Sequence, residues 1–365
     1  MKFSLIISPQ RESKLMIDLD LETKVLAFFF AFTTSLVLGG VMRKIAMSLN
    51  IFDKPDGGRK TQREPVPYLG GLAIMISFLI TVITGLYVVS PSTEVRTDII
   101  YLLLPAAALG IVGLWDDIKE LSPHFRLMVQ VLLGLAGSLT ITFGSTSGSA
   151  TGNQSTDLLL SIFWIVGVTN ALNFFDNMDG GAAVASFMTA LGIFFYSSIT
   201  NQSYLAIFGL VLMGVLAGFF YWNRRPARIY MGDSGALFLG ILLATIAIRI
   251  DPQTDSKWTS FAVPIFLLAL PILDTCVVVI SRLMNSRSPL QGGKDHLSHR
   301  LALKGIRHRT ILYIFALTSF LFQIPIYIFL GVNLEWEISV TLFYAFLFVI
   351  VFIYSVRIKV KYEDS

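Results

Sequence analysis

Cysteine is almost absent from this sequence, because Cys276 is the only cysteine among 365 residues. It lies inside an apolar run, so the chain has neither a disulfide framework nor a thiolate metal site. Charge is scarce as well, since Asp, Glu, Lys and Arg make up only 14% of the residues. About a quarter of the residues in a typical soluble domain are charged, so this deficit argues against a soluble protein.

Hydrophobic residues are correspondingly abundant: they make up 54% of the chain, and its mean hydropathy is +0.70. They fall into runs of about 18 to 24 residues, each long enough to cross the hydrocarbon core of a bilayer. The composition therefore predicts an all-α, polytopic membrane protein with about eleven transmembrane helices. The predicted spans are residues 24–46, 68–90, 98–115, 125–145, 157–175, 181–200, 203–222, 234–250, 258–281, 311–331 and 336–356.

The basic residues orient these spans, because 21 of the 28 Lys and Arg fall on the same side of the membrane. By the positive-inside rule that side is cytosolic, which predicts a multi-pass protein of the cell (plasma or inner) membrane with its N-terminus outside. The sequence pI near 9.1 then reflects these loops, and we expect no nucleic-acid partner. The basic loops are residues 43–63, 116–126, 222–228 and 282–309 and the tail after residue 356.

The chain divides into one membrane domain and two tails. Residues 1–22 lack the ordered charged head, apolar stretch and cleavage site of a signal peptide, so they are expected to remain as an extracytoplasmic tail. Residues 23–357 form the predicted membrane domain, a helical bundle around an active-site cleft that faces the cytosol. Residues 358–365 form a cytosolic C-terminal tail.

Five acidic residues stand at the predicted cytosolic ends of spans. Asp116 and Asp117 end the third span, Asp176 and Asp179 follow the fifth, and Asp233 precedes the eighth. Carboxylates gathered on one face need cations to offset their repulsion, and hard oxygen ligands favour Mg²⁺ together with substrate phosphates. A single acid in such a place could instead cap a helix or pair with Arg or Lys. Five on one face favour a metal-dependent site.

Basic residues form a second polar cluster on the same face. His296 and His299 stand three residues apart in "KDHLSHR", beside Arg300. Two histidines without a third ligand are a weak zinc signal, and the neighbouring cations favour phosphate binding. In "RKTQREPVPYLGG", Lys60 precedes a Pro-x-Pro turn that would hold it near the lipid headgroups. The alternative for both segments is a basic loop that only sets topology.

Asp274, in "LPILDTC", is the one acid predicted to lie well within a span. An intramembrane acid is costly to bury and is by default a functional residue. A hydrogen-bonded contact between helices is an equally weighted alternative. His124 and His308 are interpreted as ordinary polar loop residues.

These segments together resemble the polyprenyl-phosphate N-acetylhexosamine-1-phosphate transferases, the superfamily of glycosyltransferase family 4. The similarity extends from about residue 53 to residue 310, with five motifs in the order that the family has them. The WecA/TagO-like branch is the most similar, and the phospho-MurNAc-pentapeptide translocase is related. The motifs are "RKTQREPVPYLGG", "GLWDD", "NALNFFDNMDGG", "IYMGDSGALFLG" and "RSPLQGGKDHLSHRL".

The resemblance implies a membrane enzyme with two very different substrates. Family members transfer a sugar-1-phosphate, here with UDP-GlcNAc as the favoured UDP-sugar, to undecaprenyl or another polyprenyl phosphate. The products are a polyprenyl-diphospho-sugar and UMP, in the first membrane step of cell-wall or surface polysaccharide synthesis. The resemblance also implies Mg²⁺ as cofactor, with Mn²⁺ as a substitute, and suggests a homodimer.

The family's functional residues are carried over by position in its motifs. Asp233 and Asn173 match metal-side residues, and Tyr230 matches an aromatic residue against uracil. Lys60 and Arg126 match contacts to the lipid phosphate and to substrate. His299 and Arg300 match residues that hold the sugar and diphosphate. The catalytic positions are Asp116 and Asp117 near the lipid phosphate, Asp176 and Asp179 near the nucleotide, and His296.

Three departures from the family pattern concern substrate contacts. Gln62 and Ser298 stand where His is frequent, and Arg126 stands where Lys is frequent. Arg is planar and bidentate whereas Lys is a point charge, so Arg126 would hold phosphate differently. Ser298 bears on the choice of sugar more than on the reaction type.

The sequence leaves alternatives open for both function and mechanism. A phospho-MurNAc-pentapeptide transferase is the alternative enzyme, and an ion-coupled transporter is the alternative of another class. Transporters place ionisable groups near the midplane, whereas nearly all of the acids here stand at span ends. For the enzyme, we favour direct in-line attack of the lipid phosphate over a covalent intermediate on Asp116 or Asp117.

Overall fold

The computed structural model describes residues 19–53, 65–142, 151–254, 257–289 and 293–360. Within these residues the fold is almost wholly helical, and the exception is a two-stranded antiparallel sheet of two residues per strand. The first elements are α2 (Leu21–Ser48), β1 (Phe52–Asp53), β2 (Val66–Pro67), α3 (Gly70–Val89), α4 (Thr93–Lys119), α5 (Pro123–Thr142), α6 (Gln154–Phe175) and α7 (Gly181–Ile199). The others are α8 (Ser203–Asn223), α9 (Gly232–Arg249), α10 (Lys257–Leu267), α11 (Ala269–Met284), α12 (Leu297–Leu303), α13 (His308–Ile328), η1 (Phe329–Gly331) and α14 (Leu334–Arg357).

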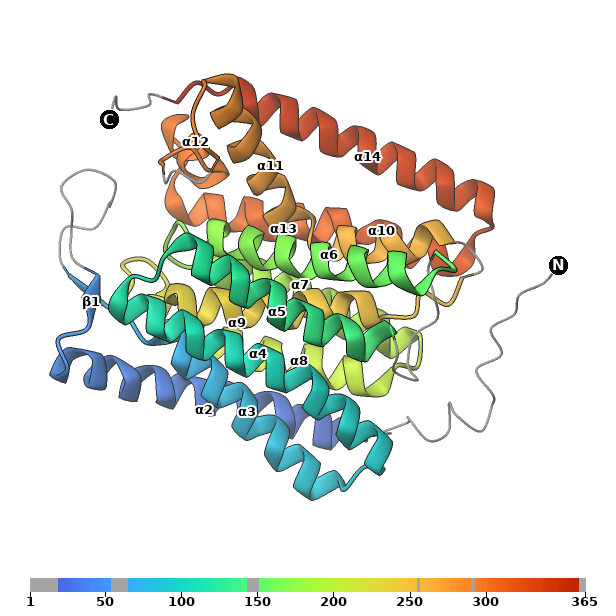
Figure 1. The fold of residues 1–365 in the computed structure, drawn as a ribbon, viewed down its shortest axis with the longest axis horizontal. Coiled ribbons are helices and arrows are strands. Elements are labelled where there is room, and N and C mark those ends of the chain that lie inside the picture. Colours follow the sequence, from blue (N-terminus) through green and yellow to red (C-terminus); the bar gives the residue numbers. More distant parts are fainter. Residues whose placement is uncertain (1–18, 54–64, 143–150, 255–256, 290–292, 361–365) are drawn as a thin grey trace.

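Long helices run back and forth along the long axis of the molecule (Figure 1). In the part of the chain that the structure describes, ten helices are long and apolar enough to cross a membrane, and the α10–α11 pair brings the number up to eleven. The prediction of an all-α, multi-pass membrane protein is therefore confirmed. In Figure 1, β1, α12 and the C-terminal end of α14 lie together at the left end of the bundle, here named the α12 end.

One predicted span differs in shape from the expectation. Residues 258–281 were predicted as one continuous helix, but α10 and α11 meet at an angle of 80°. The break falls at Leu268, which has a non-helical conformation. Pro271 stands three residues later and has no N–H to continue the helical ladder, which favours a break at this point.

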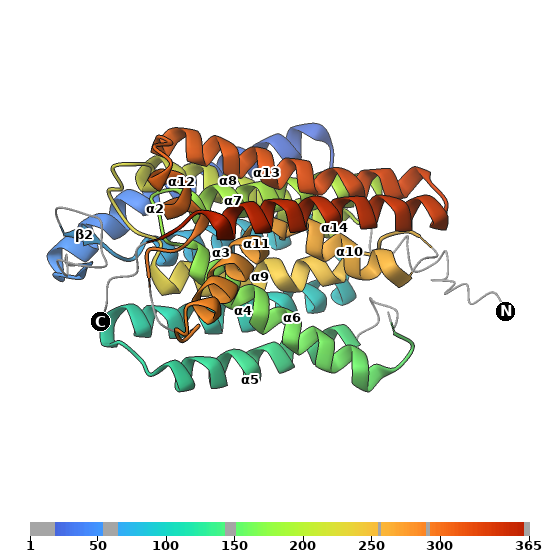
Figure 2. The same ribbon diagram turned by 90° about the horizontal axis from the view of Figure 1, so that it is seen from above.

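The bundle is built around α9. Fifteen of its 18 residues are buried, whereas α14 buries only Glu337 and Ser355. Seen from above, α9 lies in the interior, and α5 lies at one edge (Figure 2). Helices α3, α4 and α6 pack against α9. A polar residue at the start of α9 therefore has a fixed position relative to three neighbouring helices.

Glycines allow α3 and α4 to approach the first turn of α9 very closely. A Cβ atom on Gly71 of α3 would stand 2.0 Å from the backbone nitrogen of Gly235, and one on Gly113 of α4 would stand 2.4 Å from the carbonyl oxygen of Asp233. The Gly71 N–H also donates to the Met231 carbonyl oxygen at 2.8 Å. Backbone contact of this kind leaves the start of α9 little freedom to move.

We expect Gly71→Ala to destabilise the protein, because the added methyl group would collide with backbone that cannot move aside. Overpacking of this kind costs about 1–3 kcal/mol or more. The matched control is Gly85→Ala on the same helix, where a Cβ atom meets nothing within 4 Å. Thermal unfolding in detergent should show a lower Tm for Gly71→Ala and no loss for Gly85→Ala. Equal Tm values would contradict the close approach of α3 and α9.

Candidate active site

The carboxylate of Asp117 holds the first turn of α9. Its two oxygens accept the backbone N–H groups of Asp233 at 2.8 Å and of Ser234 at 3.0 Å. These N–H groups have no partner within a helix, and a negative charge there also interacts favourably with the helix dipole. Of the predicted acids, Asp117 is thus the one whose side chain caps a helix. It joins the end of α4 to the start of α9.

A single arginine joins the other two acids of this cluster. Nη1 of Arg126 lies 2.6 Å from Oδ2 of Asp116 and 3.2 Å from Oδ2 of Asp233. Asn173, near the end of α6, donates its side-chain N–H to the other oxygen of Asp233 at 2.5 Å. The Asp233 side chain remains 28% exposed whereas that of Asp116 is 4% exposed, so Asp233 is the acid that a ligand can reach.

Both oxygens of Asp116 are bonded, and the side chain is almost fully buried. One of its oxygens accepts the Leu121 N–H at 2.6 Å, and the other binds Arg126. Arg126 was predicted to contact substrate. The structure places it between two carboxylates, where it offsets their mutual repulsion.

The loop after α6 adds two more acids beside Asp233. Burial, followed by the charges of Asp233 and Asp179, raises the pKa of Asp176 to about 7. Asp179 accepts the backbone N–H of Ala227 at 3.2 Å, which ties this loop to the segment before α9. A carboxyl group with so high a pKa lies where negative charge is not fully offset, and a cation would be bound favourably there.

Tyr230 stands just before α9 and faces the same loop. Its ring centroid lies 6.3 Å from that of Tyr68. Burial, followed by the charge of Asp179, raises the pKa of the Tyr230 phenol. The ring therefore lies beside the acids predicted to face the nucleotide, and it is partly exposed.

The predicted histidine segment also contacts the loop after α6. Ser298 donates a hydrogen bond to the Asn177 side chain, which connects α12 directly with the loop between Asp176 and Asp179. His296 and His299 lie close together, with 5.9 Å between ring centroids. Burial, followed by the charge of His296, lowers the pKa of His299 to about 4. His299 is therefore neutral near pH 7.

Arg300 has a different position from the one expected. It is 1% exposed, and its guanidinium donates to the carbonyl oxygens of Asp295 at 2.7 Å and Ile358 at 2.7 Å and to the hydroxyl of Ser281 at 2.7 Å. Further contacts reach the end of α14. These bonds tie α11, α12 and the residues after α14 together. The geometry thus assigns Arg300 to holding the fold at the α12 end, whereas substrate contact was predicted.

Other predicted residues fall in different places. Lys60 and Gln62 lie outside the described residues. His124 is exposed, as an ordinary loop residue would be. His308 begins α13, and both of its ring nitrogens are buried without a hydrogen-bond partner, so it is not a solvated loop residue. The sequence pattern contained no signal for this, because burial at a helix start depends on the neighbouring segments.

The donor set fits a hard cation that shares its coordination with a ligand. In the described residues, no group of three or more His, Cys, Asp or Glu side chains could hold a metal ion by itself. Zinc bound by the histidines thus has no support. Mg²⁺ needs only one or two protein oxygens and takes the others from phosphates and water. Asp233 and Asn173 carry such oxygens, and a cation would also be favourable beside Asp176, whose pKa is raised by burial and by the charges of Asp233 and Asp179.

We expect Arg300→Lys to destabilise the protein. Lysine is a point charge with three donors and cannot reproduce the fork of bonds from one buried guanidinium. Loss of one hydrogen bond to a charged group costs about 1.5–3 kcal/mol. Arg307→Lys is the control, because Arg307 is an exposed residue just before α13. Thermal unfolding should show a lower Tm for Arg300→Lys alone, and an unchanged Tm would return Arg300 to the candidate substrate contacts.

Known proteins are similar to this chain over most of its length. The sequence model of glycosyl transferase family 4 matches residues 99–251. A probable undecaprenyl-phosphate N-acetylglucosaminyl 1-phosphate transferase of Bacillus subtilis is 30% identical over 317 residues, which cover 85% of this chain and 86% of that protein.

Two further relatives have different names. A decaprenyl-phosphate N-acetylglucosaminephosphotransferase of Mycolicibacterium smegmatis is 29% identical over 279 residues, or 69% of this chain and 68% of that protein. A phospho-N-acetylmuramoyl-pentapeptide-transferase of Limosilactobacillus fermentum is 32% identical over 227 residues, or 59% of this chain and 67% of that protein. Because the similarity to the Bacillus subtilis protein extends over most of both chains, this protein belongs to glycosyl transferase family 4, the polyprenyl-phosphate N-acetylhexosamine-1-phosphate transferases.

Proposed function

We propose that this protein transfers GlcNAc-1-phosphate from UDP-GlcNAc to a polyprenyl phosphate, giving polyprenyl-diphospho-GlcNAc and UMP. The observation that carries the proposal is the convergence of Asp116 and Asp233 on Arg126, with Asp176 beside them, at the end of membrane-spanning helices. Such a place is open to a water-soluble nucleotide sugar and to a lipid that stays in the bilayer. The names of the relatives support the same reaction.

We infer that the proposed site lies on the cytosolic side of the cell membrane. The basic loops of the sequence favour this orientation, because positive residues stay on the cytosolic side. UDP-sugars are then available on the side where the acids gather. A homodimer is suggested by the family resemblance, and the reaction as proposed uses residues of one chain.

In the reaction, an oxygen of the lipid phosphate attacks the β-phosphorus of UDP-GlcNAc, and UMP leaves. A phosphomonoester has a second pKa of about 6, so the attacking group is already mostly dianionic near pH 7. Positioning and charge neutralisation should therefore contribute more than a general base. Mg²⁺, held by Asp233 and Asn173 together with substrate oxygens, would supply the charge neutralisation.

The chain's own residues divide the remaining tasks. Tyr230 would lie against the uracil ring, and Asp176 and Asp179 would face the nucleotide. Lys60 would bind the lipid phosphate. The guanidinium of Arg126 would offset the negative charges of Asp116 and Asp233, which would otherwise repel the incoming phosphates. His296 and His299 would lie along the diphosphate.

Direct attack is favoured over a covalent enzyme intermediate by the occupancy of the carboxylates. Both oxygens of Asp117 accept N–H groups of α9, and both oxygens of Asp116 are bound. A carboxylate that acted as nucleophile would have to give up these bonds before it could form an acyl phosphate.

The purified protein should transfer radiolabel from UDP-GlcNAc into an organic-extractable lipid and release UMP. Unlabelled UDP-GlcNAc should compete for transfer more effectively than UDP-MurNAc-pentapeptide. The reverse order of competition would favour the pentapeptide branch, which the Limosilactobacillus fermentum relative represents. Absence of transfer with either donor, in protein that retains its thermal transition, would overturn the proposal and favour the transporter alternative.

We expect Asp233→Asn to lose most of the transfer activity and to need more Mg²⁺, because the amide has lost the negative charge that attracts the ion. Mg²⁺ should also raise the Tm of the unaltered protein more at pH 8 than at pH 6, since protons compete at Asp176, whose pKa is about 7. Asp98→Asn is the control, because this half-buried acid lies about 27 Å from Asp116 along α4. Ordinary turnover of Asp233→Asn at ordinary Mg²⁺ would remove Asp233 from the site.

A further inference from the structure

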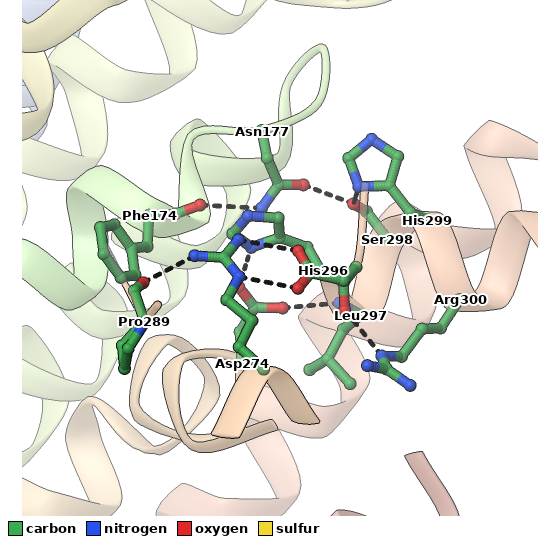
Figure 3. A network of polar contacts seen from close by, with 11 residues as sticks. Phe174, Asn177, Asp274, Pro289, His296, Leu297, Ser298, His299 and Arg300 are labelled. Carbon is green, nitrogen blue, oxygen red and sulfur yellow. Dashed lines mark hydrogen bonds and ion pairs between the residues drawn. The ribbon is translucent and has the colours of Figure 1, made fainter. Parts of the chain in front are cut away.

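The buried acid of the broken span is engaged by the histidine segment. Asp274 is 0% exposed and belongs to α11, a few residues after the break that ends α10. Its Oδ2 lies 2.8 Å from Nδ1 of His296, and its Oδ1 accepts the backbone N–H of Leu297 at 2.6 Å. Figure 3 shows both contacts as dashed lines. The acid therefore contacts the side chain of one residue and the backbone of the next.

The nearby arginine does not compensate the charge of Asp274. Arg282 makes two bonds to Asp295, from Nε to Oδ2 and from Nη2 to Oδ1, each of 2.8 Å. Its Nη1 donates to the carbonyl oxygen of Pro289 at 2.8 Å. Among the ion pairs found between described residues, the partner of Asp274 is His296. Two separate acid–base pairs thus hold the segment before α12, and one of them includes a predicted catalytic residue.

The contact determines where the His296 ring carries its proton. An ionised carboxylate can only accept hydrogen bonds, so Nδ1 of His296 has to be the donor. The other ring nitrogen, Nε2, has no hydrogen-bond partner in the described part of the chain. It is also not one of the polar atoms that are fully buried without a partner. The side chain is 8% exposed. Nε2 is therefore the ring atom that a ligand can reach.

The segment is held against the acidic loop at a second point. Ser298, two residues after His296, donates to the side chain of Asn177 between Asp176 and Asp179. His299 is neutral near pH 7, since burial lowers its pKa to about 4. Of the two rings, His296 is the one backed by a carboxylate. A carboxylate behind an imidazole stabilises its positive charge and fixes its orientation.

We propose that Asp274 is a positioning residue that fixes His296 with Nδ1–H toward Asp274 and supports a second proton on Nε2, so that Nε2–H can donate to a diphosphate oxygen of the UDP-sugar. The inference rests on the proposed function for the identity of the ligand. No bond to phosphorus is made or broken by either residue, and both protons stay on the imidazole. Asp274 acts through His296 because its own carboxylate is sealed from substrate.

The test is Asp274→Asn. The amide has one oxygen, which the Leu297 N–H would occupy, and its NH₂ group would then face Nδ1 and move the ring proton to Nε2. With ¹⁵N-labelled histidine, only four imidazoles contribute to the spectrum, and His296→Gln identifies the signal of His296. We expect a protonated Nδ1 in the unaltered protein and an unprotonated Nδ1 in the variant. The variant would keep a donor at Nε2 but lose the carboxylate that supports a proton on both ring nitrogens, so the ring would face the diphosphate without its positive charge. This loss should lower kcat about 10–100-fold, with little change in the KM for UDP-GlcNAc.

A double variant separates positioning from a purely structural role. If Asp274 acts through His296, Asp274→Asn should cost nothing further in a His296→Gln background, because the two changes remove the same interaction. Asp295→Asn breaks the neighbouring pair with Arg282, and it should lower the Tm without moving the proton on His296. Asp98→Asn should change neither kcat nor the spectrum.

The inference and the proposed function fail in different ways. A neutral His296 with its proton on Nε2 in the unaltered protein would overturn the inference even if the variant did not fold. Unchanged kcat in a folded Asp274→Asn variant, with transfer intact, would also overturn it and leave the function standing. Absence of transfer in the unaltered protein would remove the function, and the spectrum would still report the contact.

Discussion

The first turn of α9 is the constraint on which the site depends. Asp117 accepts its free N–H groups, and glycines at positions 71 and 113 let two helices press against its backbone. This turn carries Asp233, the exposed acid of the cluster. Because α9 is the most central helix, the position of Asp233 is determined by the packing of the bundle and not by a loop. Rigid elements hold a reacting geometry better than loops do.

Negative charge at this end of the bundle exceeds what the nearby cations offset. Arg126 contacts both Asp116 and Asp233, and the pKa of Asp176 rises to about 7. A divalent cation that arrived with phosphates, as proposed above, would be favourable at such a site.

At the α12 end of the protein, buried polar contacts hold a short helix beside the site. Helix α12 has only seven residues and cannot be stable alone. Arg300 ties it to α11 and to the residues after α14, and Asp274 holds the residues at its start. These bonds explain why the Arg300 and Asp274 side chains are buried, although burying a charged group is costly. Both side chains anchor the segment that bears His296.

The sequence by itself determined the class of fold and the position of the acids, because bilayer thickness sets the length of apolar runs and basic loops orient them. The five motifs also identified the family. Tertiary structure decided which partners the polar residues have: Arg126 binds acids, Arg300 is buried, and Asp117 caps a helix. It also decided that Asp274 reaches His296 across a break in the span. Local sequence could not determine these pairings, since each joins segments that meet only when the helices pack.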